Sequence, residues 1–189
     1  MFFGISILLL FTAMAYAHNP VIVKKDSSKE KPVLIEKPEI SYAYYGELSG
    51  EPHYYKIVSS KPFTLYVNIL VPDYSPKTNP ILRHDMSFQV LKDANDSPDP
   101  AKSGTVIFTA EGMNSDWRRF YEEYGRDHYY WGPEFEQKAG AGTYYIKVYN
   151  KNNTGKYSLA TGKEERFGFF GIIRAFFRAR SLDKWFFKP

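Results

Sequence analysis

The chain has 189 residues and no cysteine, so no disulfide bond contributes to its stability. Exported domains that are very small commonly depend on disulfides, whereas a longer domain can be stabilised by its hydrophobic core alone. Roughly 120 residues of patterned sequence are long enough to bury such a core. Aromatic residues make up 18% of the chain, well above ordinary usage, and this enrichment favours a β-rich core.

Motifs of common catalytic sites are also lacking. The sequence has no Gly-x-Ser-x-Gly elbow, no His-Glu-x-x-His zinc motif and no glycine-rich phosphate loop. The four histidines are too scattered along the chain to indicate a zinc site by their spacing. We therefore expect a protein that binds rather than an enzyme, without a catalytic cofactor.

Positive charge is concentrated at one end of the chain. The net charge is +4, and residues 167–189 carry five basic side chains against one acidic side chain, so the rest of the chain is neutral. Binding to nucleic acid requires a basic face that neutralises phosphates. We therefore expect no nucleic-acid partner for the body of the protein.

The first 17 residues, MFFGISILLLFTAMAYA, have no charged side chain. The apolar run is about 16 residues long, which is short for a bilayer span. It ends in Ala15-Tyr16-Ala17, the small-x-small pattern that signal peptidase accepts. We interpret residues 1–17 as a signal peptide and expect a secreted or envelope protein, with an uncleaved N-terminal anchor as the alternative. Residues 18–39, rich in Lys, Glu, Ser and Pro, are typical of a tether.

Residues 40–162 alternate with a period of two. In residues 63–72, for example, Leu65, Val67 and Ile69 share one face. Similar runs, bounded by turn-forming residues, occupy 40–48, 52–59, 86–93, 104–112, 133–139, 142–150 and 156–162. This spacing predicts an all-β domain, an antiparallel jelly-roll-like β-sandwich.

One hairpin has a recognisable sequence, AGAGTYYIKVYNKNNTGKYSLATG at residues 139–162. Gly142 opens a strand, Ile146 and Val148 point inward, and Tyr157 and Leu159 return to the core. This stretch resembles the final hairpin of the bacterial pre-peptidase C-terminal domains. Residues 45–70 resemble the sequence at the beginning of the same domains. The resemblance implies an exported, non-catalytic β-sandwich that accompanies other activities.

Residues 116–135, DWRRFYEEYGRDHYYWGPEF, contain eight aromatic side chains in twenty positions. No regular period holds between residues 114 and 130, which predicts a long loop with one helical turn that brings Trp117, Tyr121 and Tyr124 to one face. In one interpretation Trp117, Phe120, Tyr124 and Trp131 plug one end of the sandwich.

In the other interpretation the aromatic rings form a carbohydrate-binding platform, because aromatic faces stack on sugar rings. The candidate ligand-binding residues are Trp117, Arg118, Tyr121, Tyr124, Asp127, Tyr129, Tyr130 and Trp131. Carboxylates close to the tryptophans, such as Glu122 and Glu134, leave a glycoside hydrolase as a third alternative.

The segment 92–99 joins two expected strands and gathers oxygen-bearing side chains, Asp93, Asn95, Asp96 and Asp99. Calcium requires six to eight oxygen ligands, and these residues are candidates for some of them. The EF-hand arrangement of glycine and bidentate glutamate is absent, and Asp and Asn are also common in ordinary turns. A plain turn and a weak calcium site are therefore the two alternative interpretations of this segment.

Residues 163–189 form a basic, aromatic tail, which we predict to contain a C-terminal amphipathic helix. The candidate contact residues are Phe169, Ile172, Ile173, Phe176 and Phe177 on one helical face, Arg174 and Arg178 opposite them, and Trp185. Such a helix is typical of attachment to an anionic membrane surface. The alternatives are that the helix docks on the sandwich or that it binds in the groove of a partner protein. The expected function is an exported accessory binding module, held at the cell envelope by this tail.

Overall fold

The computed structural model describes residues 19–23, 27–28, 30–74, 84–93, 104–122, 126–164 and 185–188. Within these ranges the chain forms eleven strands and one short 3₁₀ helix. The elements are β1 (Asn19–Ile22), β2 (Val33–Ile35), β3 (Tyr42–Ser49), β4 (His53–Ser59), β5 (Phe63–Pro72), β6 (Ser87–Asp93), β7 (Gly104–Ala110), η1 (Gly112–Asn114), β8 (Arg118–Glu122), β9 (Asp127–Ala139), β10 (Gly142–Tyr149) and β11 (Thr154–Thr161).

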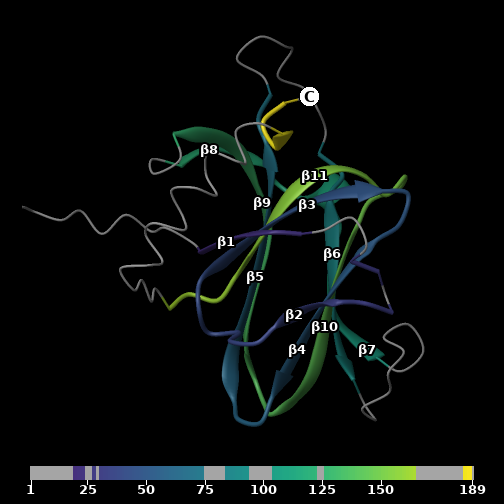
Figure 1. Ribbon diagram of the computed structural model, residues 1–189, viewed down its shortest axis with the longest axis vertical. Helices are drawn as coiled ribbons and strands as arrows, with labels where there is room; N and C mark the ends of the chain where they lie inside the picture. Colours follow the sequence, from purple (N-terminus) through teal and green to yellow (C-terminus); the bar gives the residue numbers. More distant parts are fainter. Residues whose placement is uncertain are drawn as a thin grey trace, which may run out of the picture.

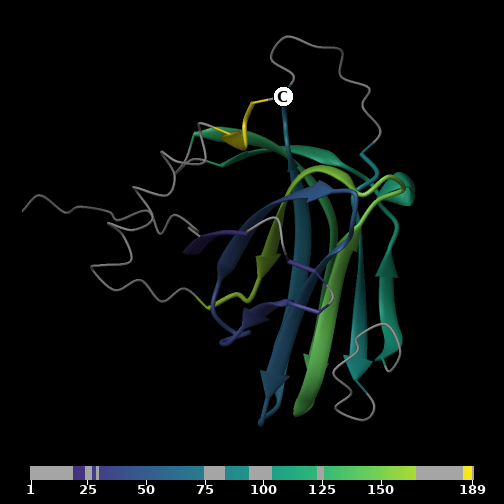
Figure 2. The ribbon, with the colours of Figure 1, turned by 45° about the vertical axis from the view of Figure 1, so that its right-hand side comes forward.

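The strands form two curled sheets that pack as a sandwich (Figure 1). One sheet has six strands in the order β1-β3-β11-β5-β9-β8, and the other has five in the order β2-β4-β10-β6-β7. The prediction of an all-β sandwich is confirmed. Figure 2 shows the curvature of the long central strands from a second direction.

The sheets are mixed rather than purely antiparallel, which corrects the prediction. β1 pairs with β3 and β2 pairs with β4 in parallel, and all the other strand pairs are antiparallel. The first five strands alternate between the two sheets, so the chain crosses to the other sheet and back between β1 and β3, and again between β2 and β4. The two strands of each of these pairs therefore run in the same direction. Both parallel strands come from residues 18–39, for which the sequence suggested a tether.

Residues 118–122 and 127–132 are not a loop with a helical turn, as the sequence suggested, but belong to two paired strands, which we call the β8–β9 hairpin. β8 pairs antiparallel with β9 from Arg118 opposite Trp131 to Glu122 opposite Asp127. The period of two was concealed because aromatic side chains occupy both faces of these strands. A strand with two apolar faces shows no hydrophobic alternation.

The main core lies between the two sheets, and its residues are those that the alternation predicts. Leu65, Val67 and Ile69 of β5 are at most 1% exposed. They pack in one cluster with residues of the opposite sheet, such as Phe88 and Ile146. Because there are no disulfides, the burial of this cluster is the main source of stability.

A hydrogen-bonded group of three side chains is buried beside this core. The Tyr157 hydroxyl lies 2.7 Å from Nδ1 of His53 and 2.8 Å from the Tyr55 hydroxyl. A Cβ atom on Gly46 would lie 2.7 Å from the Tyr157 ring, so glycine makes room for the tyrosine. Each polar group thereby has a partner, which removes most of the cost of its burial.

In the part of the chain that the structure describes, no helix has the length and apolar character needed to cross a membrane. The proposed signal peptide at residues 1–17 lies outside the described residues. The same holds for residues 165–184, where the C-terminal amphipathic helix was predicted.

Replacing Gly132 by alanine should destabilise the fold by about 1–3 kcal/mol, the usual cost of overpacking a close contact. A Cβ atom at this position would lie 2.4 Å from the Trp117 ring and 2.9 Å from the Ile69 carbonyl oxygen. Urea unfolding measures the change. Gly140→Ala is the matched control, because a Cβ atom there has nothing within 4 Å. Equal stabilities of the two variants would contradict the packing argument.

Acidification should destabilise the protein through His53. Burial lowers the pKa of His53 below its ordinary value of 6.5. The unfolded state therefore binds more protons than the folded state below about pH 6.5, and stability falls as the pH drops, by at most ~1.4 kcal/mol per pH unit. The loss in melting temperature between pH 7.5 and 5.5 should be smaller in His53→Gln. Some loss should persist in that variant, because burial also lowers the pKa of His84. An unchanged difference between the two pH values in His53→Gln would remove His53 as a cause.

Candidate functional site

The six-stranded sheet is apolar on its outer face as well as on its core face. On β5, Tyr66 and Leu70 point away from the core and are at most 7% exposed. They belong to a second cluster with Tyr129, Ala160 and Phe186, distinct from the main core. The outer face of a sandwich sheet usually carries polar side chains, so this buried apolar cluster shows that other parts of the chain cover the outer face.

A pocket of about 610 Å³ lies on this outer face, and we call it the outer pocket. Ala43 on β3 and Ala160 on β11 are paired directly across the two strands and provide small side chains in its lining. The large lining residues are Tyr45, Tyr66, Leu70, Phe120, Tyr129 and Trp131. Small side chains surrounded by large ones leave a hollow, and its volume falls within the range of small-ligand sites.

The β8–β9 hairpin supplies the aromatic residues at one side of the outer pocket, and an ion pair fixes its position. Arg119 on β8 donates from Nη2 and Nε to Oδ2 of Asp73, at 2.8 and 2.9 Å. The Asp73 side chain is fully buried just beyond the end of β5. On the other face of β8, the Arg118 guanidinium lies over the Trp131 ring, 5.5 Å from its centroid. These contacts hold Trp131 in place as a wall of the pocket.

The tyrosine hydroxyls of the outer pocket are neutral groups. Tyr45 and Tyr129 bring their hydroxyl oxygens to 3.3 Å. Burial raises the pKa of Tyr45 to about 12, and it raises that of Tyr129 as well. Near neutral pH these groups form hydrogen bonds and do not act as nucleophiles or bases.

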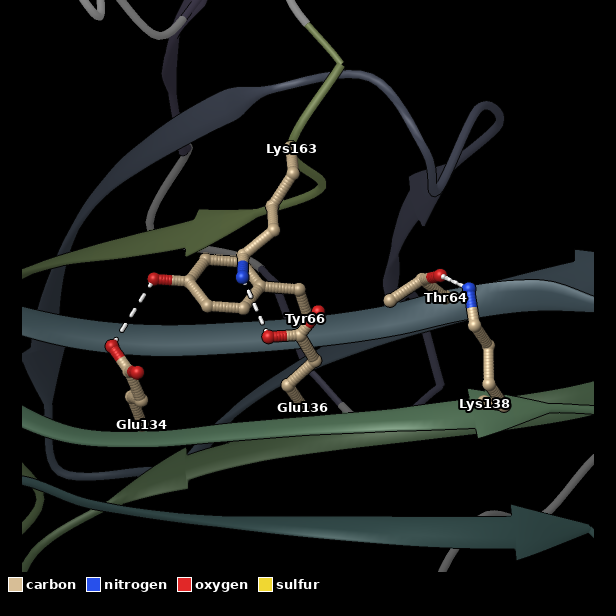
Figure 3. A network of polar contacts seen from close by, with 6 residues as sticks. All are labelled: Thr64, Tyr66, Glu134, Glu136, Lys138 and Lys163. Atoms are coloured by element: carbon tan, nitrogen blue, oxygen red, sulfur yellow. Dashed lines mark hydrogen bonds and ion pairs between the residues drawn. The ribbon is translucent and has the colours of Figure 1, made fainter.

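Polar side chains border the outer pocket at Tyr66 (Figure 3). The Tyr66 hydroxyl donates to Oε2 of Glu134 at 3.4 Å. The Lys163 ammonium lies over the Tyr66 ring, 4.8 Å from its centroid, and forms an ion pair with Glu136 at 2.5 Å. Glu136 therefore offsets the charge of Lys163, while Glu134 accepts the hydrogen bond of Tyr66.

The described C-terminal residues, 185–188, pack on the same outer face. In both ribbon views this yellow segment lies beside the end of the β8–β9 hairpin (Figures 1 and 2). Phe186 is fully buried, with its ring 4.9 Å from that of Tyr45 and 6.3 Å from that of Tyr129. Trp185, predicted to contact a membrane or partner, is half-buried and packs edge-on against Phe186 at 5.5 Å.

Main-chain carbonyls of this segment accept hydrogen bonds from two side chains of the domain. The Tyr74 hydroxyl donates to the Phe186 carbonyl at 3.1 Å, and Nζ of Lys156 donates to the Trp185 carbonyl at 2.8 Å. Lys156 also donates to the carbonyl of Lys188. We call the site formed by Tyr45, Tyr74, Tyr129 and Lys156 the aromatic socket.

The structure distributes the predicted ligand-binding residues over different surfaces. Tyr129 and Trp131 line the outer pocket, whereas Trp117 and Tyr130 pack against the main core.

The other predicted ligand-binding residues lie outside the pocket lining or outside the described residues. Tyr121 is 47% exposed and contacts His128, outside the pocket. Arg118 stacks on Trp131, Asp127 is half-buried opposite Glu122 at the hairpin end, and Tyr124 lies outside the described residues.

Several pocket residues were missed by the reasoning from sequence. Tyr45 and Tyr66 lie far from residues 116–135 in the chain and reach the pocket only through the pairing of β3 and β5 with β11. A signal was nevertheless present, because both alternating faces of FTLYVNILVP at residues 63–72 are largely apolar. Such a strand is covered on both sides.

Residues of the other predicted sites are only partly described. Asp93 of the calcium candidates ends β6 and is buried, while Asn95, Asp96 and Asp99 lie outside the described residues. Among the residues that the structure describes, no three His, Asp or Glu side chains gather closely enough to hold a metal ion. In the tail, Phe169, Ile172, Ile173, Arg174, Phe176, Phe177 and Arg178 are also outside the described ranges.

Comparison with known proteins identifies a similar solved structure. No family model matches the sequence, and no curated protein matches it. The chain is similar to the pre-peptidase C-terminal domain of the collagenase from Bacillus anthracis, with 10% identity, a TM-score of 0.37, and coverage of 77% of this chain and 95% of that domain. This is the family that residues 45–70 and 139–162 resemble in sequence.

Proposed function

We propose that the protein is an exported, non-catalytic binding module of the cell envelope and that its ligand site is the outer pocket. One observation carries the proposal: the outer sheet face has a hollow of about 610 Å³ with aromatic and aliphatic walls. A contiguous apolar surface outside the core costs solubility and is usually retained for binding. The lining, mainly apolar with a few polar groups, is typical of small-ligand and side-chain sites.

The lining favours an apolar ligand over a sugar. Ala43, Leu70 and Ala160 offer no side-chain hydrogen bond, and the tyrosine hydroxyls already bond to each other or to Glu134. The other polar side chains of the described lining are Ser41, Glu122, Ser158 and Lys163, fewer than its apolar and aromatic ones. A sugar hydroxyl that loses water without gaining a partner costs about 1–3 kcal/mol. An aromatic or aliphatic group of a partner molecule has no hydrogen bonds to water to lose, and its burial in the pocket is favourable.

The same lining gives little support to a glycoside hydrolase. That chemistry requires two carboxyl groups at a fixed separation across a cleft. Glu122 is the single carboxylate among the described lining residues. We therefore propose binding rather than bond cleavage.

The proposed export rests on the N-terminal sequence. If residues 1–17 are a cleaved signal peptide, N-terminal sequencing of the protein recovered outside the cytoplasm should begin at His18. Replacing Ala15 and Ala17 by arginine should block this cleavage, since signal peptidase requires small side chains at these positions. Full-length chain, starting at Met1 and retained in the cytoplasm, would contradict export.

Filling the outer pocket should weaken the binding of an apolar probe. The neutral dye N-phenyl-1-naphthylamine should bind the native protein with a rise in fluorescence, and Ala160→Leu should weaken this binding about 10-fold or more, equivalent to at least ~1.4 kcal/mol. The Leu side chain would project into the pocket from β11. Ala160→Ser, which adds little volume, is the matched control.

The outcome also separates the alternative ligands. Equal dye affinity of the native protein and Ala160→Leu, with both folded by circular dichroism, would contradict the proposed site. Displacement of the dye by soluble glycans would instead favour the carbohydrate interpretation.

A further inference from the structure

The outer pocket and the aromatic socket share two of their walls. Tyr45 and Tyr129 line the pocket, and the same two rings contact Phe186 in the socket. The hydroxyls of these tyrosines are also hydrogen-bonded to each other. A ligand that moves either ring therefore affects both sites, and the two together form one continuous apolar surface.

The socket holds its occupant through main-chain groups. The three hydrogen bonds from Lys156 and Tyr74 all end on carbonyl oxygens, those of Trp185, Phe186 and Lys188. Carbonyls at this spacing belong to a polypeptide turn, closed here by a hydrogen bond from the Lys188 N–H to the Trp185 carbonyl, whereas an acyl chain or a sugar does not offer them. The socket then selects aromatic side chains, because edge-to-face pairs add about 0.5–1.5 kcal/mol beyond burial. Tyr45 forms such a pair with Phe186, and Tyr129 forms one with Phe187.

The bound segment packs on the outer face through the rings of Phe186 and Phe187 and through three hydrogen bonds, without pairing with a strand. Residues 185–188 belong to neither sheet, and Trp185 and Phe187 remain partly exposed. Twenty residues separate this segment from Glu164. A ligand tethered to its own site competes at an effective concentration that the tether sets, and a partner of higher affinity can overcome it.

We infer that the aromatic socket is a peptide-binding site, which residues 185–188 occupy in cis, and that the partner is a polypeptide segment with adjacent aromatic residues. Such a segment displaces Phe186 from the socket and places a second aromatic side chain in the outer pocket. The C-terminal segment is then an internal competitor that lowers the affinity for partners. This inference rests on the proposed function of the outer pocket and specifies its ligand.

A labelled peptide copied from the chain itself, Lys-Trp-Phe-Phe-Lys (residues 184–188), tests the inference with full-length protein. Phe186→Ala removes the side chain that fills the socket in cis, so it should bind the peptide about 10-fold or more tightly than the native chain, as measured by fluorescence anisotropy. Phe186→Leu should give an intermediate affinity. Both variants should stay folded, because Phe186 is not part of the main core between the two sheets, and circular dichroism checks this.

Adding Lys156→Met to Phe186→Ala should reverse the gain, because the donor to two main-chain carbonyls is lost. Equal peptide affinity of the native chain and Phe186→Ala, or no effect of Lys156→Met, would overturn the inference. The dye experiment with Ala160→Leu separates this failure from failure of the proposed function. If the dye still distinguishes Ala160→Leu from the native protein, the outer pocket stands and only the peptide assignment is lost.

Discussion

The six-stranded sheet buries apolar side chains on both of its faces, and the other features of the molecule depend on this. β5 lies inside that sheet between β11 and β9, with Leu65, Val67 and Ile69 in the main core and Tyr66 and Leu70 on the opposite side. Burial of the first set stabilises the fold without disulfides. Burial of the second set requires something to cover the outer face, and the β8–β9 hairpin and the C-terminal residues provide part of that cover.

The outer pocket exists because two small side chains on the sheet are surrounded by large ones, which leaves a space above the small ones unfilled. Ala43 and Ala160 are neighbours on paired strands, and the surrounding positions carry tyrosine, phenylalanine, tryptophan and leucine. Well-packed interiors avoid hollows of this size, because every void loses dispersion contacts. A hollow on an otherwise apolar face is therefore better explained by binding than by folding.

The polar chemistry around the outer pocket is consistent with recognition rather than catalysis. Tyr45 and Tyr129 are kept neutral by burial, and Lys163 is offset by Glu136. Nζ of Lys156 and the Tyr74 hydroxyl donate hydrogen bonds to main-chain carbonyls. A surface of this kind combines apolar side-chain selection with sequence-independent hydrogen bonds, as peptide-binding grooves generally do.

The sequence by itself determined the all-β architecture and the main core, because these follow from local alternation. Ile146, Val148, Tyr157 and Leu159, assigned to the core from the pattern of one hairpin, are all fully buried. The strand at 118–122 was missed for the same physical reason, since aromatic residues on both faces remove the alternation. The parallel pairing of β1 and β2 was missed because parallel partners are set by chain crossing between sheets, which no local pattern records.

The candidate site was decided by tertiary structure alone. Aromatic density pointed to residues 116–135, but strand parity sent Trp117 and Tyr130 to the core and Tyr129 and Trp131 to the outer pocket. The alanines that make the hollow have no signal in the sequence, because a small residue becomes a cavity only beside particular neighbours. Those neighbours come from β3, β5, β8, β9 and β11, and only sheet pairing brings them together.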